Sequence, residues 1–469
     1  MSTLDTTTGS LTRASWRLAW PAVLQAILVN CYAFNDFFFV GRLGDPAATA
    51  ALSACFALVI IVNVLVGVFP TGSMALMAQA FGAGDRPRVG VLFRQGLGAG
   101  LLWSLALSAL GVAALPWIIQ STYVTPEVAL RETQYMWVIL IGLVWFGLMR
   151  ATTAAFYACG NTRMPLTLEV FSLLVNTGLN ALLVPRYGIE GAAWATLASR
   201  GVPGVAGLAL LWRGHLGFEL TSGRLKDWAW RGRDLRSIAF IGAFESLSGV
   251  VYGVVYLMLN RMAGVLGPAA QGGLGAGLRG IEWIAFAFGD GFLKASVAMV
   301  GQNLGAGNAR RAWAGAALNA GMSAASCQAV GVLFMIFPVE LSQIVTDDPQ
   351  TLHYAAWYIR IMGWAMWAVG AEMSLYGAMI GAGRTHMTLL VSGALNICRV
   401  PLAAGLLFGA DALWGGTLWA AFGVGHAPEI QGDFGALPWT IVATAMAKAA
   451  LYGVYLWFTR RKARLADAG

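Results

Sequence analysis

The stretch from Leu18 to Gly44, LAWPAVLQAILVNCYAFNDFFFVGRLG, decides the fold class. It is apolar over more than the roughly 20 residues that a helix needs to cross a bilayer. Two residues interrupt this apolar run. Pro21 removes a helical hydrogen bond and can bend the helix. Asp36 is ionisable. A carboxylate inside a bilayer costs about 2.5–3.5 kcal/mol unless it faces a bundle interior or a wet cavity. Asp36 is therefore either an ion or proton site or a solvated residue near the membrane surface.

The composition of the whole chain indicates a polytopic membrane protein. Of its 469 residues, 58% are hydrophobic and 11% are charged, where a soluble domain has about 25% charged residues. We attribute the net charge of +8 to arginine-rich cytoplasmic loops rather than to a nucleic-acid surface. The start, MSTLDTTTGSLT, lacks the basic region and apolar core of a signal peptide. The five cysteines are scattered without a CxxC pair, which predicts neither disulfides nor a metal site.

Apolar runs predict an all-α fold of twelve membrane-spanning helices. We expect the first six at 17–40, 50–72, 89–115, 133–156, 165–185 and 190–212, and the second six at 237–260, 270–297, 312–337, 355–380, 387–409 and 436–458. Basic residues concentrate in alternate connections, which predicts that both termini are cytoplasmic. The longest basic connection predicts a linker at 213–236 between lobes at 1–212 and 237–469.

The two halves repeat each other at an offset of 223 residues. AQAFGAGD at 78–85 matches GQNLGAGN at 301–308, and the same offset relates CGNTRM at 159–164 to AGRTHM at 382–387. Six helices per copy is an even number, so the repeat is parallel and a central cavity between the lobes is expected. Later the offset grows to 248, which predicts an insertion near 410–434 on the outer face. It either caps the cavity mouth or decorates a tolerant loop.

Catalytic motifs are missing from the sequence. GAGLRG at 275–280 matches the dinucleotide pattern GxGxxG but lacks the strand–turn–helix context that this site needs. The sequence holds no P-loop lysine, no HExxH and no nucleophile elbow. We therefore predict that the protein is not an enzyme and takes no cofactor.

Polar residues of the first half form a candidate site around Asp36. Asn176 and Asn180 are four residues apart and share a helical face, and Thr196 follows in the next predicted helix. Carboxylate, carbonyl and hydroxyl oxygens suit a hard cation such as Na⁺, and the same carboxylate can instead take a proton. The alternative is that the amides only form hydrogen bonds between helices.

The second half carries different chemistry. Position 259, the equivalent of Asp36, is Leu259, and the equivalent of Asn176 is Arg399. The candidates for a substrate cavity there are Glu282, Glu372 and Arg399, together with aromatic residues such as Tyr376 that can stack on cations. Glu282 can instead pair with Arg279 three residues earlier, as Asp290 can with Lys294. The aromatic residues can equally belong to the core or the membrane interface.

Several segments taken together resemble one transporter family. They are WPAVLQ, NDFFFVGRLG, AQAFGAGD, YACGNTRMP, NTGLNALLVP, GIEGAAWAT and VGQNLGAGN. The chain is similar to the multidrug and toxic compound extrusion (MATE) transporters, most of all to their DinF-like branch. The resemblance implies twelve helices in two lobes, rocker-like alternating access, and antiport of organic cations or other amphiphiles against Na⁺ or H⁺.

The resemblance also implies roles for individual residues. Asp36 falls on the family's first-helix acid, Pro21 on its bendable proline, Asn176 on the fifth-helix Asn and Thr196 on the sixth-helix Thr. Asn180 departs from the pattern, because many relatives carry Asp there, and this weakens a Na⁺ assignment.

Two further positions relate to the NorM-like branch. Tyr252 stands where some of those relatives carry a cavity Glu. Glu372 lies within one residue of their tenth-helix acid.

We therefore predict a monomeric exporter in the bacterial inner membrane that moves small amphiphilic or cationic substrates, with H⁺ favoured over Na⁺. We expect no nucleic-acid partner. The alternative is a lipid-linked-precursor flippase, which would have a strongly basic cavity open to lipid. A passive channel would instead show steady flux independent of any gradient.

Overall fold

The computed structural model describes residues 4–120, 125–217, 229–409 and 431–466, and every element in these ranges is helical. In the first half the helices are α1 (Leu11–Gly41), α2 (Pro46–Val66), α3 (Val68–Gly82), α4 (Arg86–Gln120), α5 (Pro126–Ile141), α6 (Leu143–Ala158) and α7 (Arg163–Trp212). In the second half they are α8 (Gly232–Val265), α9 (Pro268–Gly275), η2 (Ala276–Ile281), α10 (Trp283–Gly305), α11 (Ala309–Ile336), α12 (Pro338–Gln343), α13 (Pro349–Met362), η3 (Gly363–Ala365), α14 (Met366–Gly381), α15 (His386–Thr388), η4 (Leu389–Gly393), α16 (Ala394–Phe408) and α18 (Ala436–Ala466).

The predicted membrane spans can be matched to the observed helices. Nine helices of the described residues are long and apolar enough to cross a membrane, and the bent pair α5–α6 makes a tenth. The 50 residues of α7 would extend about 75 Å at 1.5 Å per residue, far beyond the roughly 30 Å hydrocarbon core. Its backbone leaves the helical region at Gly188, so α7 holds two spans. The run from α13 to α14 covers the remaining predicted span, and all twelve therefore fall on helical segments.

Pro21 lies inside α1, and the helix continues through it. Because proline has no backbone N–H, the carbonyl of Arg17 loses its helical partner. The Thr162 hydroxyl, at the start of α7, donates to this carbonyl at 3.5 Å. The predicted weak point of α1 is thus supported from a neighbouring helix.

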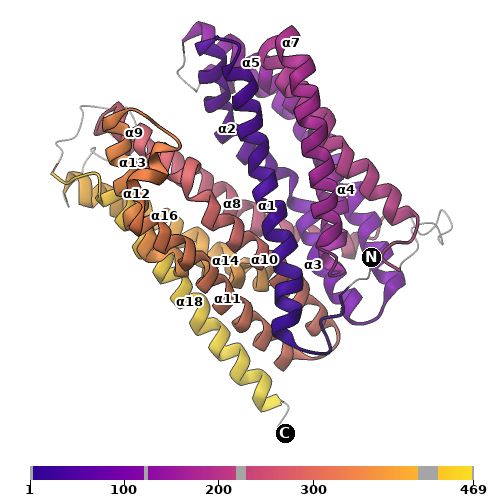
Figure 1. Cartoon of the computed structure of the whole chain (residues 1–469). Coiled ribbons are helices and arrows are strands. Elements are labelled where there is room, and N and C mark those ends of the chain that lie inside the picture. Colours follow the sequence, from indigo (N-terminus) through magenta and orange to yellow (C-terminus); the bar gives the residue numbers. More distant parts are fainter. Residues whose placement is uncertain (1–3, 121–124, 218–228, 410–430, 467–469) are drawn as a thin grey trace.

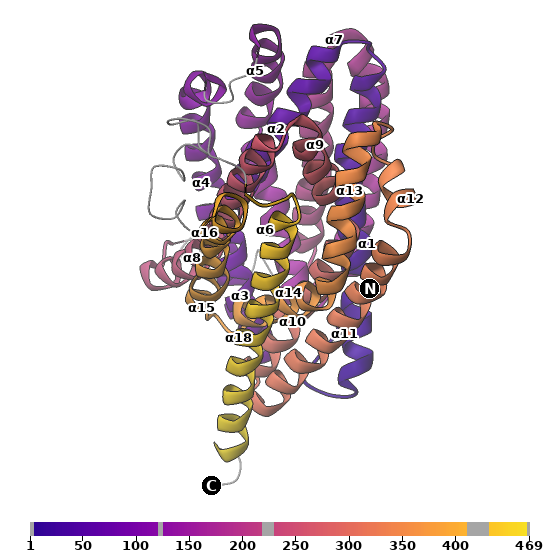
Figure 2. The ribbon, with the colours of Figure 1, turned by 90° about the vertical axis from the view of Figure 1, so that its left-hand side faces the viewer.

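The helices form two groups, α1–α7 and α8–α18 (Figure 1). The groups lie apart at the end where α2, α5 and α7 of one face α9 and α13 of the other, and they come together at the opposite end. At that closed end α3 packs against α8 and α10, and α1 packs along α10. The first turns of α1 and the end of α18 also lie there, as Figure 2 shows from the side.

Glycines let the two groups touch at the closed end. A Cβ on Gly82 of α3 would overlap the backbone carbonyl of Gln302 in α10. A Cβ on Gly305 of α10 would overlap the carbonyl of Gln79 in α3. Gly82 and Gly305 are equivalent positions of the sequence repeat, so the repeated motif is where the halves meet.

Two predicted segments lie largely outside the described residues. They are the centre of the 213–236 linker, of which 213–217 and 229–236 are described, and the insertion near 410–434, of which only 431–434 are described. The backbone amides of Gln431 and Gly432 both donate to the Leu407 carbonyl at 2.9 Å. The chain therefore re-enters the described part beside the end of α16. The division into lobes and the role of the insertion stay predictions.

Candidate functional site

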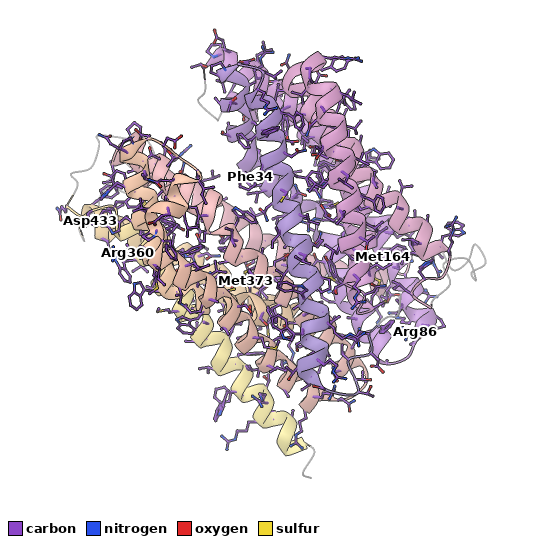
Figure 3. The ribbon with its side chains drawn as sticks, in the orientation of Figure 1. Phe34, Arg86, Met164, Arg360, Met373 and Asp433 are labelled. Carbon is purple, nitrogen blue, oxygen red and sulfur yellow. The ribbon has the colours of Figure 1, made fainter. Side chains whose placement is uncertain are left out.

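A cavity of about 790 Å³ lies between the two groups of helices. The first group contributes Asp36 and Arg200 to its wall, and the second contributes Glu245 and Lys294. Met373 of α14, which is labelled in Figure 3, also lines it. Most of the remaining lining is apolar or aromatic, which is typical of a site for small organic molecules.

Asp36 is buried on α1, with 4% of its surface exposed. The Asn180 amide Nδ2 donates to its Oδ1 at 2.8 Å, and the Thr196 hydroxyl donates to its Oδ2 at 2.9 Å. The Asn176 amide Nδ2 donates to the Thr196 Oγ1 at 3.3 Å. The structure thus brings together all four residues that the sequence predicted for the coupling site. Asp36 is buried rather than fully solvated, and its position relative to the membrane surface stays a prediction.

The cluster can hold Asp36 in either charge state. Hydrogen bonds to a charged group contribute about 1.5–3 kcal/mol each, so two of them offset the roughly 2.5–3.5 kcal/mol cost of a carboxylate in the membrane. The Asn180 Oδ1 is buried and has no hydrogen-bond partner among the described residues. It can therefore accept a hydrogen bond from a protonated Asp36 once the side chains rearrange.

A second polar chain lies next to this cluster, and sequence reasoning missed it. The Arg200 guanidinium stacks 3.7 Å from the centre of the Tyr32 ring and pairs with Glu169 at 2.6 Å. Gln25 Nε2 donates to the other Glu169 oxygen at 3.2 Å, and Gln25 Oε1 accepts from the Lys294 ammonium at 2.9 Å. Because Lys294 lies on α10, the chain crosses from the first group of helices to the second. The sequence signal for this chain was an acid and a base, Glu169 and Arg200, in two neighbouring predicted spans.

Comparison with known proteins identifies the family. The family model described as MatE matches residues 21–182 and 246–404. The chain belongs to the MatE family. The predicted resemblance to MATE transporters is confirmed at this level.

Relatives and solved structures agree with the assignment. The chain is 24% identical over 402 residues to the "Probable multidrug resistance protein NorM" of Thermotoga maritima, covering 82% of this chain and 84% of the relative. It is 23% identical over 417 residues to the "FAD transporter" of Shewanella oneidensis, covering 84% and 87%. A solved structure described as "Crystal structure of MATE in the bent conformation" covers 100% of both chains with a TM-score of 0.86 at 17% identity. The predicted all-helical membrane fold and the predicted class, a MATE transporter rather than an enzyme, are confirmed.

Of the residues predicted for a substrate cavity in the second half of this MATE protein, Tyr252 lines the cavity. Its ring lies 4.4 Å from that of Tyr256, which also lines it. The cavity lining, taken over the described residues, does not include Glu282, Glu372, Tyr376 or Arg399. A substrate role for any of them stays a prediction.

Those other residues have partners within the second half of the MATE fold. Lys448 pairs with Glu372 at 2.9 Å. The Arg399 Nε donates to the Thr444 hydroxyl at 2.6 Å.

Glu282 and Asp290 each have a partner as well. The Tyr358 hydroxyl donates to Glu282 at 2.6 Å; the side chain of Arg279, its predicted partner, lies outside the described residues. The predicted Asp290–Lys294 pair is confirmed at 2.6 Å.

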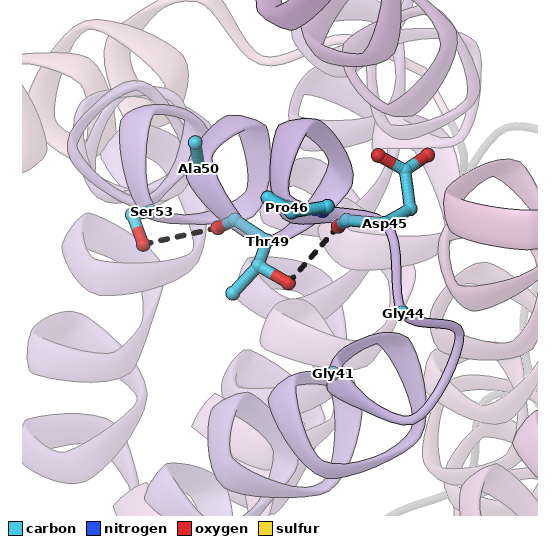
Figure 4. Close-up of a pocket in the computed structure, with 7 residues that line it drawn as sticks. All are labelled: Gly41, Gly44, Asp45, Pro46, Thr49, Ala50 and Ser53. Carbon is cyan, nitrogen blue, oxygen red and sulfur yellow. Dashed lines mark hydrogen bonds between the residues drawn. The ribbon is translucent and has the colours of Figure 1, made fainter.

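A smaller hollow lies at the turn between α1 and α2 and is lined by Asp45, Pro46 and Thr49, among others (Figure 4). One Asp45 oxygen accepts from the Ala48 amide at 3.1 Å and caps α2. The other pairs with Arg131 at 2.9 Å. Both carboxylate oxygens thus already have partners within the protein, and we assign the hollow no ligand.

Proposed function

We propose that this MATE protein exports small amphiphilic and cationic compounds across the bacterial inner membrane, driven by proton entry. The observation that carries the proposal is the buried Asp36 cluster in the wall of the cavity. An ionisable residue inside the membrane that faces a cavity is the usual means by which carriers couple ion movement to transport. The name of the relative in Thermotoga, given for multidrug resistance, supports export of drugs.

The groups around Asp36 favour a proton over Na⁺. A hard cation such as Na⁺ binds several oxygen atoms directed at it, and Asn180 stands where many relatives carry a second carboxylate. Here Asn180 directs an N–H and Thr196 an O–H at Asp36. Both donors stabilise a single ionised carboxylate, which can then bind a proton. Protonation replaces an acceptor by a donor, so the cluster must rearrange when the ion arrives.

Alternating access provides the coupling step. The connections at the closed end carry basic residues such as Arg88 and Arg311, so we place this end and both termini in the cytoplasm. The cavity then opens outward. Protonation of Asp36 changes its hydrogen bonds to α7, α1 bends at Pro21, and the substrate leaves on the outer side.

The finer assignments belong to the same proposal. We place the chain in the DinF-like branch, because its Asp36 cluster lies in the first half and Tyr252 stands where some relatives of the NorM-like branch carry a cavity Glu. We assign residues 1–212 and 237–469 to two lobes that rock as units, with 213–236 as their cytoplasmic linker. The working unit is a monomer, because each chain holds its own cavity.

The charge of the cavity argues against two other substrates. A flippase for lipid-linked precursors, or a carrier for a dinucleotide anion such as the one named for the Shewanella relative, needs a strongly basic cavity. The lining here contains four acids (Asp36, Glu169, Glu245 and Asp290) against three bases (Arg150, Arg200 and Lys294). This balance suits cationic or neutral amphiphiles better.

The experiment is ethidium transport into inverted vesicles that contain the protein, with a pH gradient and a Na⁺ gradient imposed separately. We expect accumulation with the pH gradient and none with the Na⁺ gradient. Transport driven by Na⁺ alone would contradict the choice of ion. Ethidium flux independent of both gradients would indicate a channel. No transport of any dye, together with lipid translocation, would indicate the flippase.

A further inference from the structure

The Lys294 ammonium lies in a cage built from both groups of helices. Its Nζ donates to Asp290 Oδ2 at 2.6 Å and to Gln25 Oε1 at 2.9 Å. It also lies 5.1 Å from the centre of the Tyr157 ring. A carboxylate, an amide oxygen and an aromatic face are the three kinds of group that hold an organic ammonium ion. We call Gln25, Tyr157 and Asp290 the Lys294 cage.

The cage is fixed in place by the polar chain behind it. Arg200 holds one oxygen of Glu169 at 2.6 Å, and the other Glu169 oxygen accepts from Gln25 Nε2 at 3.2 Å. Because the Gln25 NH₂ group is held by Glu169, its Oε1 is directed at Lys294. The Tyr157 hydroxyl donates to the same Oε1 at 2.8 Å. The acceptor is therefore preorganised for a cation before any substrate arrives.

The cage opens onto the substrate cavity. Gln25, Tyr157, Asp290 and Lys294 all line it. The Asp290 side chain is 34% exposed and that of Lys294 is 18% exposed, so the carboxylate is the more accessible partner. A cation entering the cavity can reach Asp290 without unfolding any helix.

We propose that Lys294 is a tethered stand-in for the cationic group of the transported molecule, and that substrate binds by displacing Lys294 from Asp290 and Gln25. The inference rests on the proposed export of cationic compounds and names their class. Both oxygen acceptors lie within hydrogen-bond distance of the ammonium, so the cage favours protonated primary and secondary amines over quaternary ammonium ions, which have no N–H to donate. Because Gln25 and Asp290 belong to different groups of helices, the displacing amine bridges the two halves.

A tethered competitor lowers the apparent affinity for substrate. The apparent Kd equals the intrinsic Kd divided by the fraction of molecules whose site is free. If Lys294 occupies the cage in about nine molecules of ten, its removal tightens binding about tenfold by this relation. Removal of Asp290 has the opposite effect, because the cage then lacks its charged acceptor.

The test is the Kd of the purified full-length protein for dansylcadaverine, a fluorescent primary amine, and for its trimethylammonium analogue. We expect Lys294→Ala to lower the Kd of the primary amine by about tenfold or more and to change that of the quaternary analogue less. Lys294→Gln, which can still form hydrogen bonds with the cage but carries no charge, should also lower the Kd of the primary amine. Lys294→Arg should stay near wild type, because it keeps a cation in place.

Three further variants separate the cage from general effects. Asp290→Asn should raise the Kd of the primary amine about tenfold, and the Lys294→Ala/Asp290→Asn double variant should show no tightening. Arg131→Gln breaks an ion pair with Asp45 outside the cavity and should leave the Kd unchanged. If neither Lys294→Ala nor Lys294→Gln tightens amine binding, the stand-in role is overturned. Equal tightening for both probes would overturn the preference for N–H donors.

Failure here can be told apart from failure of the proposed function. Proton-driven ethidium transport by wild type, with no tightening in the Lys294 variants, would overturn the cage and leave the exporter standing. Tightened amine binding in the Lys294 variants, without gradient-driven transport by wild type, would overturn the exporter and leave the cage standing.

Discussion

Gln79 and Gln302, which occupy the same position in the two sequence repeats, form equivalent bonds across the closed end of the molecule. The Gln79 Nε2 donates to the backbone carbonyl of Gly381 at 2.9 Å, and the Gln302 Nε2 donates to that of Ala158 at 2.9 Å. Gly381 and Ala158 are themselves related by the offset of 223 residues. Each glutamine therefore ties its own half to the other half. The repeated motif works as a pair of latches at the end that we place in the cytoplasm.

The Gln302 side chain has additional hydrogen-bond partners in the segment before α1, which Gln79 lacks among the described residues. The Thr6 hydroxyl and backbone amide both donate to Gln302 Oε1, at 2.8 Å and 3.3 Å. Arg311 donates to the carbonyls of Thr6 and Thr8. The segment before α1 thus lies across this latch, and we expect the Gln302 latch to be the stronger of the two.

Gln302→Ala should open the closed end more often. A hydrogen bond contributes about 0.5–1.5 kcal/mol net, so its loss raises the open population by up to about tenfold. Cys159 is fully buried beside Ala158 and should become reactive. The measurement is the rate of maleimide labelling in inverted vesicles, in a Cys31→Ser/Cys398→Ser background that removes the more accessible thiols. We expect an increase of about two- to tenfold by the same estimate.

Gln328→Ala is the matched control for this latch. The Gln328 Nε2 also donates to a backbone carbonyl, that of Gly363, at 2.9 Å, but both residues belong to the second group of helices. Labelling of Cys159 should not change. Equal rates in the Gln302 and Gln328 variants would show that the latch does not hold the two halves together.

Asn180→Asp should convert the Asp36 cluster into a sodium-responsive site. The Asn180 side chain lies 2.8 Å from Asp36, and two carboxylates at that distance do not both ionise unless a cation or a proton lies between them. We expect Na⁺ to drive ethidium transport by the variant but not by wild type. Asn63→Asp, which adds an acid elsewhere in the cavity wall, should not respond to Na⁺. A sodium response of wild type, or none in Asn180→Asp, contradicts the prediction.

Glu372→Gln should destabilise the protein rather than uncouple it. The Lys448 side chain, 2% exposed, would be left without its partner, and breaking a buried pair costs about 3–5 kcal/mol. Glu372→Gln/Lys448→Met should recover most of the lost stability, measured by thermal unfolding in detergent, and should still transport ethidium under a pH gradient. A stable double variant that has lost proton coupling would instead assign Glu372 to the coupling machinery.

Much of the fold could be predicted from the sequence because the membrane allows few solutions. A chain in lipid must satisfy its backbone within helices, so apolar runs of sufficient length locate them. The offset that links Gln79 to Gln302 also predicted where the halves correspond, though not that the two motifs would touch. That contact depends on the close approach at Gly82 and Gly305, which only the packed structure reveals.

The candidate site was predicted in part, for a related reason. Asp36 and the amides Asn176 and Asn180 stood out because polar residues are rare in apolar sequence. Glu169 and Arg200 meet the same criterion, but their pairing is not visible from either span alone, because a span tolerates a charge when its partner comes from another helix. The position of Glu372 away from the cavity lining depends on how α14 packs, which one sequence does not determine.

The central claim is that Asp36 carries the proton. The most direct measurement is substrate-driven proton movement by the purified protein in liposomes that contain a pH-sensitive dye, comparing wild type, Asp36→Asn and the loop variant Asp45→Asn. Wild type and Asp45→Asn should exchange protons for substrate. Asp36→Asn should bind substrate yet move no protons. Proton exchange by Asp36→Asn at the wild-type rate would contradict the account.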